Sequence, residues 1–490
     1  MTAELRGGRR AGTDAKGVVS NSGWQLLAFG FRAAAGVTVV VLLARSGGPV
    51  LLGVVQFALT LSSLLPFYFG VPALLAREVA RRPEEGRRWV EAGTLVALAF
   101  GGLFTALLPA GAWAVGASRE TVLAIGVAAL GMTWDGVARV QFASFWADER
   151  MDLEARVTGL QEAFYVGLTG IVLAAGGGPL AALGAFTASR ALGAVLAWWM
   201  VGRRHGGVPV PRASRRFLVQ AVRRCTPFAI SDTLTLTYMR VDSVLLGIVK
   251  GPAAVGLYQA ATNLVLYFNV VARSVNRALY PRMGRAWPDR RGEFGRLRDV
   301  SLRVIAFLGV PLAVGSVLLA PRTIDFLYGP AFAPAVLTYQ LLALVIPVRM
   351  AGHTLSLSLA ATDRQTARTV AVTVTALVNV ALNLVLIPRW SYLGAAVATV
   401  VCETGLLIAY AVLLLRVAGR SVLLGAHVMP VLACLPMAAA VLLTADRHLL
   451  VSAVAGGAAY TAAVALLALV RSGAERRPAR ALAVRVGARS

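Results

Sequence analysis

The sequence predicts an all-α integral membrane protein with about 14 transmembrane helices. Of its 490 residues, 58% are hydrophobic and only 14% are charged. A soluble protein of this length could not bury so much apolar surface, so lipid must solvate much of the chain. The apolar residues form runs of roughly 20, the length of one helical crossing of a bilayer. These runs are too long and too uniformly apolar for the strands of a membrane barrel.

Fourteen runs meet this length criterion, and no connecting segment is long enough for a separate soluble domain. The expected spans lie near 20–44, 50–75, 89–113, 120–146, 153–175, 180–202, 217–249, 254–283, 299–321, 332–361, 366–387, 392–415, 422–444 and 449–470. The first run is too long for the core of a typical signal peptide, so we expect an uncleaved first span.

The cations are concentrated on one side of the predicted spans. The chain has 48 Lys and Arg against 23 Asp and Glu, a net charge of +25, and only Lys16 and Lys250 are lysines. With the N-terminus placed in the cytoplasm, the segments on that side carry 31 cations, and the opposite turns carry 6. The positive-inside rule therefore predicts that both termini are cytoplasmic. A nucleic-acid partner is not expected, because these cations lie in short loops between apolar runs.

A motif recurs at an offset of 203 residues. Gly48-Pro49 and Gly251-Pro252 are each followed by a glycine and a glutamine at the same spacing, in the pattern GP-xxx-G-xx-Q. Chance recurrence in a chain rich in Ala and Gly is the alternative, but the shared spacing favours an internal repeat. Spans one to six and seven to twelve then form two six-helix lobes in the same orientation, and two C-terminal helices are additional.

The expected organisation has six parts, of which the linker is marked by Gly, Pro and Arg. They are a cytoplasmic N-terminal segment at 1–19, an N-lobe at 20–202, a cytoplasmic linker at 203–216, a C-lobe at 217–415, the extra helices at 416–470 and a basic cytoplasmic tail at 471–490. The arginines of the tail suit contact with anionic lipid; a solvated, disordered tail is the alternative.

Arginines inside spans are the main candidates for substrate contacts. An arginine at the centre of a spanning helix costs about 2.5–3.5 kcal/mol on insertion scales. An opposite charge at about 4 Å, with an effective dielectric constant of about 20, stabilises it by about 4 kcal/mol. Each such arginine therefore needs a carboxylate of the chain or an anionic ligand.

Spans eight and ten carry polar stripes with cations at helical spacing. In span ten, Arg349 and His353 lie one turn apart, and anion binding by His353 is as well supported as a packing role. Arg277 could reach the membrane interface by snorkelling, whereas Arg273 lies deeper. The stripe in span eight has two cations and no acid, and consists of Asn269, Arg273, Asn276, Arg277 and Tyr280. In span one, Gln25 and Arg32 lie near one face, with Arg32 close to mid-depth.

The acidic residues inside spans are candidates for ion pairs or coupling sites. Asp135 and Arg139 are four residues apart in span four, which favours a pair within one helix. In span seven, Asp232 and Asp242 share a face, while Arg240 points elsewhere. Arg240 and Asp242 are expected to pair with neighbouring helices, because a two-residue step turns about 200° around a helix. The mid-span acids Glu162 and Glu403 could be partners of the arginines or sites for a proton or cation.

Signatures of other protein classes are missing from the sequence. It has no metal-ligand spacing, no phosphate-binding loop followed by Lys and Ser or Thr, and no long outer loop for catalytic residues, so we expect neither an enzyme nor a bound cofactor or metal. Three cysteines in or beside apolar segments do not indicate a disulfide framework. Without an ATP site, transport would be driven by gradients.

Residues 227–262, PFAISDTLTLTYMRVDSVLLGIVKGPAAVGLYQAAT, resemble the seventh and eighth helices of bacterial polysaccharide flippases of the Wzx type, in the MATE-like MOP exporter superfamily. Supporting matches over about residues 20–415 are LLARSGGPVLLGVVQFA at 42–58, ARE at 76–78, FLYGPAF at 326–332 and NVALNLVLIPRWSYLGAAVAT at 379–399. The resemblance implies two six-helix lobes around a central cavity, alternating access, and cationic cavity residues that meet a pyrophosphate.

The implied substrate is an undecaprenyl-pyrophosphate-linked oligosaccharide that crosses the cytoplasmic membrane for polysaccharide assembly. Arg32, Arg273 and Arg349 are the positions that could serve the pyrophosphate, and Arg77 could meet an entering headgroup. Membrane lipids and polysaccharide assembly proteins are the other expected partners. Two alternatives are a flippase for a lipid-linked cell-wall precursor and a multidrug or cation antiporter of the same superfamily. The antiporter would be expected to have unpaired acids in its cavity, whereas this sequence is expected to offer unpaired arginines.

Overall fold

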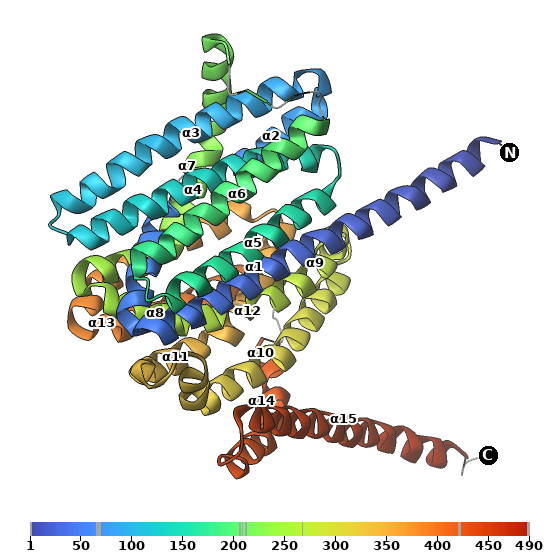
Figure 1. Cartoon of the computed structure of the whole chain (residues 1–490). Helices are drawn as coiled ribbons and strands as arrows, with labels where there is room; N and C mark the ends of the chain where they lie inside the picture. Colours follow the sequence, from blue (N-terminus) through green and yellow to red (C-terminus); the bar gives the residue numbers. More distant parts are fainter. Residues whose placement is uncertain are drawn as a thin grey trace. The chain divides into compact units, whose positions relative to one another are not determined.

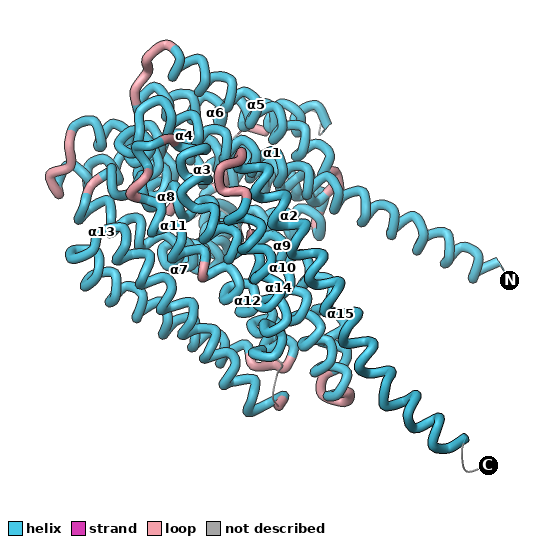
Figure 2. Tube along the Cα trace, turned by 90° about the horizontal axis from the view of Figure 1, so that it is seen from below, coloured by secondary structure: helices cyan, strands magenta, loops and turns pink. Residues whose placement is uncertain are grey.

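The computed structural model describes residues 2–64, 70–204, 207, 209–210, 213–266, 268–419 and 423–487; within these ranges, the side chains of 2–19, 70, 83, 230–239, 269–274, 277–278, 423–424 and 470–487 are not described. The described part consists of helices and connecting turns, with no β-strand (Figure 2). The predicted fold class, an all-α membrane protein, is confirmed.

The first seven helices are α1 (Thr2–Ser62), α2 (Gly70–Arg81), α3 (Pro83–Ala114), α4 (Arg119–Ala147), α5 (Met151–Ala174), α6 (Pro179–Arg204) and α7 (Arg215–Lys250). The other helices are α8 (Pro252–Leu266), α9 (Asn269–Ala286), α10 (Arg291–Tyr328), α11 (Ala335–Ala343), α12 (Val345–Ala361), α13 (Gln365–Ala418), α14 (Leu423–Leu443) and α15 (Leu449–Gly487), with a 3₁₀ turn at Pro330–Phe332.

The predicted spans and the helices correspond closely, but not one to one. Helix α1 contains span one and the first part of span two, joined at a break where Gly48 has φ +63°, and span two ends within α2. Helix α13 contains spans eleven and twelve and is broken at Ser391. Span eight is divided between α8 and α9, and span ten between α11 and α12. In the described part, ten helices are long and apolar enough to cross a membrane, and two of them, of 43 and 54 residues, are long enough to cross twice.

The chain forms two compact units, Met1–Gly256 and Leu257–Ser490. In the first unit, α4 packs against α3 and α6, and α5 packs against α6 and α1 (Figure 1). Helix α7 contacts α1, α2 and α3 and so belongs to this unit. The two lobes predicted from the sequence repeat differ from these compact units. The linker predicted between the lobes, at 203–216, remains a prediction.

Small residues allow close helix packing in the first unit, as is usual where helices associate in lipid. A Cβ atom at Gly131 would lie 2.7 Å from the ring of Phe186, so α4 and α6 approach closely there. An apolar core that includes Trp89, Phe145 and Cys225 joins α3, α4 and α7 at the arginine-rich end of these helices. This packing fixes the polar side chains on α4, α5 and α6.

In the second unit, α10 packs against α9, α11, α12 and α14. Two hydrogen bonds connect the C-terminal pair of helices, α14 and α15, to α10. The Tyr460 hydroxyl donates to the Phe307 carbonyl oxygen at 2.8 Å, and Arg322 donates to Ser452 Oγ at 2.7 Å. The additional helices expected at 416–470 therefore pack on α10.

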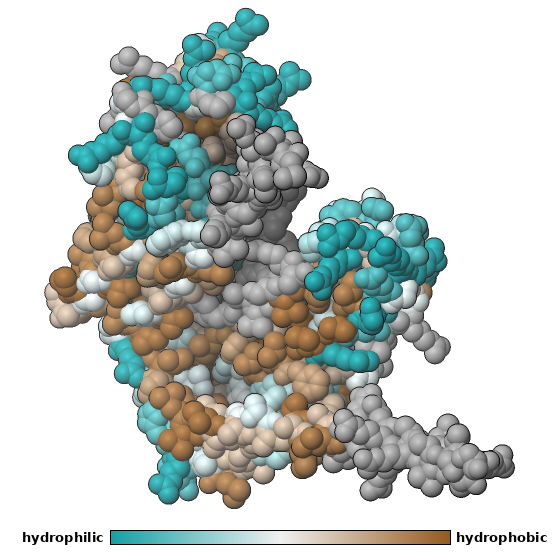
Figure 3. All heavy atoms as spheres, turned by 90° about the vertical axis from the view of Figure 1, so that its right-hand side faces the viewer, coloured by the Kyte–Doolittle hydropathy of each residue, from teal (hydrophilic) through white to brown (hydrophobic). Residues whose placement is uncertain are grey.

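Large apolar side chains cover much of the described surface. Leu377, Leu435 and Ile171 are each 67–68% exposed, and Figure 3 shows broad brown areas of apolar side chains on one face. In a stable protein, an exposed apolar surface of this extent contacts lipid or another partner. Together with the ten apolar helices, it indicates a multi-pass membrane protein.

Candidate functional site

A network of buried charges crosses α4, α5 and α6 in the first unit. Arg139 Nε donates to Asp135 Oδ2 at 2.7 Å, which is the pair expected from their spacing. Arg190 on α6 donates to both carboxylate oxygens of Glu162 on α5, at 2.7 and 3.2 Å. The same guanidinium lies 3.8 Å from Asp135 Oδ1 and so links the two pairs. Glu162, for which the sequence left two roles open, is the partner of an arginine.

Aromatic rings complete the surroundings of Arg190. Its guanidinium carbon lies 4.8 Å from the ring centroid of Phe186 and 5.5 Å from that of Tyr165. Arg190 is 9% exposed and Glu162 is 4% exposed. Charges buried to this extent persist because they are paired and hydrogen-bonded. Sequence reasoning missed Arg190, although its place in the middle of span six carries the same insertion cost as the arginines that were selected.

A second cluster is centred on Glu154 near the start of α5. Its carboxylate accepts hydrogen bonds from Gln25 at 2.9 Å, from Arg32 at 3.3 Å and from Trp146 at 2.6 Å. Arg32 Nη2 also donates to Thr158 Oγ1 at 3.2 Å. Gln25 and Arg32 were predicted to share a face of the first span, and they bind the same carboxylate. Glu154 was missed because it stands at the end of its predicted span, next to a loop.

The prediction that the deep arginines lack a carboxylate of the chain is wrong for Arg32 and Arg349. Arg32 pairs with Glu154, whose side chain is 3% exposed. In the second unit, Arg349 donates from Nε and Nη2 to Glu403 Oε1, at 2.9 and 2.6 Å. Their partners are 122 and 54 positions away in the sequence, so no helical spacing relates them. Glu403 is thereby an ion-pair partner, and His353 is partly buried one turn from Arg349.

The ion pairs differ in how far they are open to their surroundings. The Arg32 side chain is 36% exposed, whereas that of Arg190 is 11% exposed. Both hydrogen bonds of Arg32 use Nη2, which leaves its Nη1 and Nε without a bond to any residue that the structure describes. Because an arginine can bind a phosphate through several N–H groups at once, Arg32 combines a structural pair with unused donors.

Arg77 on α2 pairs with its neighbour Glu78 at 3.1 Å, and its side chain is half exposed. The other oxygen of Glu78 accepts a hydrogen bond from Arg224 on α7 at 2.9 Å. Glu78 is 6% exposed, so two exposed arginines share one buried carboxylate. This cluster carries one excess positive charge.

Other predicted residues make local hydrogen bonds or have side chains that the structure does not describe. Asp242 accepts hydrogen bonds from the backbone N–H and the hydroxyl of Ser243, at 2.7 and 3.3 Å. Arg240 forms no ion pair with any residue that the structure describes. The predicted residues whose side chains are not described are Asp232, Asn269, Arg273 and Arg277.

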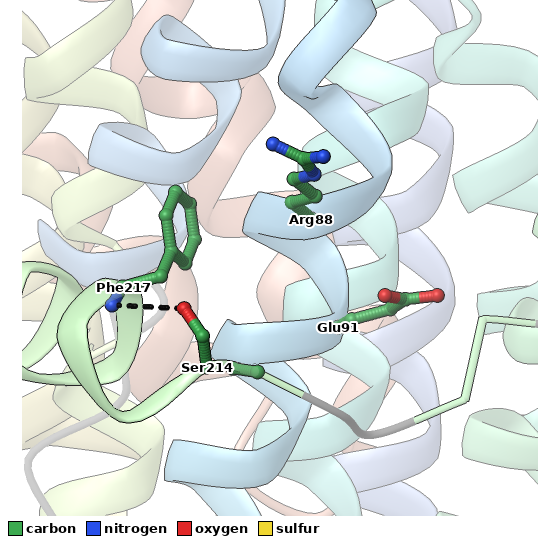
Figure 4. A pocket seen from close by; sticks show the side chains of 5 residues that line it. Arg88, Glu91, Ser214 and Phe217 are labelled. Carbon is green, nitrogen blue, oxygen red and sulfur yellow. Dashed lines mark hydrogen bonds between the residues drawn. The ribbon is translucent and has the colours of Figure 1, made fainter.

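A cavity of about 430 Å³ lies between α3 and the start of α7, lined by Arg88, Glu91, Ala213, Ser214 and Phe217 (Figure 4). Ser214 caps α7, since its Oγ accepts a hydrogen bond from the Phe217 N–H at 3.4 Å. In Figure 4 the Glu91 carboxylate points away from Phe217, and it pairs with Arg87 at 2.9 Å. No residue predicted from the sequence lines this cavity. Within the described part of the chain, no group of three or more His, Cys, Asp and Glu could hold a metal ion.

Comparison with known proteins identifies shared sequence and a shared fold. A probable flippase, AglR of Haloferax volcanii, is 26% identical over 175 residues, which cover 34% of this chain and 36% of AglR. The chain thus matches only about a third of the length of this relative.

Among solved structures, the lipid II flippase MurJ in an inward closed conformation aligns with a TM-score of 0.73 at 16% identity, covering 91% of this chain and 98% of that chain. A MATE family multidrug resistance transporter of the MOP superfamily, in an inward-facing conformation, aligns with a TM-score of 0.59 at 15% identity, covering 82% and 94%. At these identities the likeness shows the fold alone, and it agrees with the predicted all-α membrane fold.

The sequence also matches a family of defined role. The family described as polysaccharide biosynthesis protein matches residues 42–337, which is more than half of the chain. The match includes the Gly-Pro motifs, the ARE segment and helices α2 to α10. On this evidence, the chain belongs to the polysaccharide biosynthesis protein family.

Proposed function

We propose that this protein is a flippase that moves undecaprenyl-pyrophosphate-linked oligosaccharide units across the cytoplasmic membrane for polysaccharide biosynthesis. The observation that carries the proposal is the family match over residues 42–337. The sequence similarity to a probable flippase and the fold shared with MurJ support it. In this function the protein is a transporter and not an enzyme, and its partners are the lipid-linked substrate, membrane lipids and polysaccharide assembly proteins.

The distribution of charge supports an orientation with both termini in the cytoplasm. The expected cytoplasmic segments carry 31 Lys and Arg, against 6 in the opposite turns. The arginine-rich end of α2, α3 and α7 then faces the cytoplasm, where lipid-linked sugars are made available to a flippase. Arg77 and Arg224 would attract the pyrophosphate there, because their cluster carries an excess positive charge.

Deeper in the first unit, Arg32 is the residue best suited to meet the pyrophosphate. Its guanidinium is partly exposed and keeps Nη1 and Nε available while Nη2 is held by Glu154 and Thr158. The carboxylate fixes the guanidinium without neutralising every donor, so a visiting phosphate gains a preoriented partner. In alternating access, the site must bind the phosphate more tightly in one state than in the other. The pair with Glu154 supplies such a difference if its strength changes between states.

A second candidate function is transport of a lipid-linked cell-wall precursor. The MurJ alignment favours it, because it covers 98% of the MurJ chain with a TM-score of 0.73. The two functions share the lipid-pyrophosphate chemistry and differ in the sugar. A multidrug or cation antiporter shares the fold as well, but the family match over residues 42–337 favours a cargo of polysaccharide biosynthesis.

The test compares the candidate cargoes on the purified protein in proteoliposomes. Each vesicle set contains a fluorescent undecaprenyl-pyrophosphate oligosaccharide, a fluorescent lipid II, or a cationic dye, and an impermeant reductant reports the fraction of each on the outer leaflet. We expect protein-dependent exchange of the oligosaccharide lipid at a higher rate than lipid II, and no pumping of the dye under a proton or sodium gradient. Faster movement of lipid II would select the second function, and gradient-driven dye transport would overturn both.

A further inference from the structure

The two copies of the Gly-Pro motif adopt the same backbone conformation. Gly48 has φ +63° and ψ −160°, and Gly251, which lies 203 positions later, has φ +82° and ψ −179°. Only glycine adopts this region readily. Each is followed by a proline at the start of a helical segment, where the missing N–H and fixed φ of proline are favourable. The repeat found in the sequence is therefore also a repeat of structure.

The two copies also contact each other, entirely within the first unit. The Cα of Gly53 in α1 faces the carbonyl oxygen of Pro252, and a Cβ atom built on Gly53 would lie 3.0 Å from the Gly256 nitrogen. The Cα of Gly256 in α8 faces the carbonyl oxygen of Pro49, and a Cβ atom there would lie 3.1 Å from the Gly53 nitrogen. In both cases the added Cβ atom would lie even closer to the proline carbonyl oxygen. The atoms that exclude a side chain here belong to the backbone, which cannot change rotamer to make room.

The contact is reciprocal. Position 53 meets the turn that begins the second copy, and position 256 meets the turn that begins the first. Reciprocal contact between equivalent positions is the signature of a local two-fold axis. Neither glycine has a positive φ, so close approach is the reason that glycine is required at both. Loose packing would not need two glycines, since many others in this chain, such as Gly102 and Gly184, face open space.

We infer that Gly53 and Gly256 are paired positioning residues that close the Gly-Pro end of the transport path. This inference rests on the proposed alternating access. Both motifs begin a helical segment after a turn, so the contact between Gly53 and Gly256 lies at one end of the spans. We call this contact the crossing. A symmetry-related pair of helix ends in backbone contact leaves no space for a cargo between them. Opening at this end requires the crossing to part, and the glycines allow it to re-form completely in the closed state.

The test follows two reporters, one in α1 beside the crossing and one in α7 at its arginine-rich end, by the rate of labelling with an impermeant maleimide. One reporter is a cysteine in place of Leu52, which is 0% exposed beside the crossing, and the other is the natural Cys225, which is 7% exposed at the arginine-rich end. Each is studied in a background that lacks the other cysteines. The variants Gly53→Ala and Gly256→Ala are compared with Gly102→Ala, whose added methyl group meets no atom within 4 Å.

We expect either tight-contact variant to speed labelling at position 52 by about tenfold, which corresponds to a shift of about 1.4 kcal/mol between the two states, and to slow labelling of Cys225. Gly102→Ala should change neither rate. Faster labelling at both ends would mean that the glycines only maintain packing, and unchanged rates would mean that the crossing does not limit access; either result would overturn the inference.

A second measurement needs no glycine variant. In proteoliposomes without the variants, labelling at position 52 should accelerate when the fluorescent oligosaccharide lipid is added and turnover begins. Continued transport with position 52 protected throughout would contradict the inference. The labelling of the glycine variants requires no cargo, so a failure of the proposed substrate would leave their reciprocal change intact and would be recognised separately.

Discussion

Arg190 and Arg32 illustrate two ways in which this chain places an arginine within a predicted span. Arg190 is held by Glu162 through two hydrogen bonds, lies 3.8 Å from Asp135, and contacts two aromatic rings. Arg32 contacts Glu154 and Thr158 through one nitrogen and has a side chain that is 36% exposed. The comparison teaches that a carboxylate partner alone does not separate a structural arginine from a binding one. What separates them is how many donors stay available and how far they are exposed.

The largest expected effect is the loss of stability when Arg190 is replaced. In Arg190→Met, Glu162 would remain buried without its partner, and breaking a buried pair in this way destabilises a protein by about 3–5 kcal/mol. We expect little folded protein in the membrane and a much lower unfolding temperature in detergent. The measurements are the membrane abundance and thermal stability of the variant.

The matched control for Arg190 removes both charges. Arg190→Met combined with Glu162→Met should recover much of the lost abundance, because no uncompensated carboxylate of that pair remains. A stable single variant that also flips the oligosaccharide lipid normally would show that the network is dispensable, and the distinction from Arg32 would then fail.

Arg32 should show the opposite pattern. Arg32→Gln keeps a polar side chain near Glu154, which still has Gln25 and Trp146 as donors, so we expect nearly normal abundance. Loss of the partly exposed guanidinium should lower flipping of the oligosaccharide lipid by about tenfold to a hundredfold, as expected for a charge-assisted contact worth about 1.5–3 kcal/mol. The measurement is the rate at which the variant flips the oligosaccharide lipid in proteoliposomes.

The control for Arg32 is Arg156→Gln, which removes an arginine that is 65% exposed and pairs with Asp152 on the same helix. Its flipping rate should match that of the unaltered protein. If Arg32→Gln flips as fast as this control, Arg32 is a structural residue like Arg190.

Arg349 and Arg273 test the same distinction in the second unit. Arg349→Ala should abolish surface polysaccharide without lowering protein abundance, because its pair with Glu403 is partly open, with side chains that are 23% and 19% exposed. Arg273→Ala is expected to do the same. Polysaccharide on the cell surface and the amount of protein in the membrane are measured together. Normal polymer from both variants would remove these arginines from the predicted substrate contacts.

Glu403→Gln adds a control that separates the two roles of Arg349. If the arginine binds cargo, freeing it from its carboxylate should preserve or increase cargo binding. If the pair only holds α12 to α13, both variants should lower stability alike. A parallel loss of stability in Arg349→Ala and Glu403→Gln would assign the pair to structure.

Local patterns predicted the fold and part of the site, while long-range contacts did not follow from them. Runs of about 20 apolar residues predicted the membrane helices, and the spacing of Asp135 and Arg139 predicted a pair that the structure contains. The partners of Arg32 and Arg349 could not be found in this way, because they stand on other helices far along the chain. Helical periodicity specifies a face of a helix, but not which helix that face meets.

The helix breaks, by contrast, follow local signals. Gly-Pro at positions 48 and 49 predicted a turn between two spans, and the chain turns there with Gly48 at positive φ. The expected boundary between spans eleven and twelve, at 388–391, includes Pro388, and α13 is broken there, with Ser391 at a positive φ of 51°. The sequence thus predicted the place of this break, but not that a serine would take the positive φ.

The smallest expected effect is at the surface pair Arg87 and Glu91, which marks the lower limit of the comparison. The two residues are one turn apart on α3, 2.9 Å from each other, and the Arg87 side chain is 46% exposed. Arg87→Gln should change the free energy of unfolding by only about 0.3–0.5 kcal/mol, because exposed pairs at this spacing are weak, and salt should reduce even this difference. Thermal unfolding of the variant at low and high salt concentration measures it. A loss as large as that of Arg190→Met would show that exposure does not rank these arginines, and the separation between structural and binding arginines would lose its physical basis.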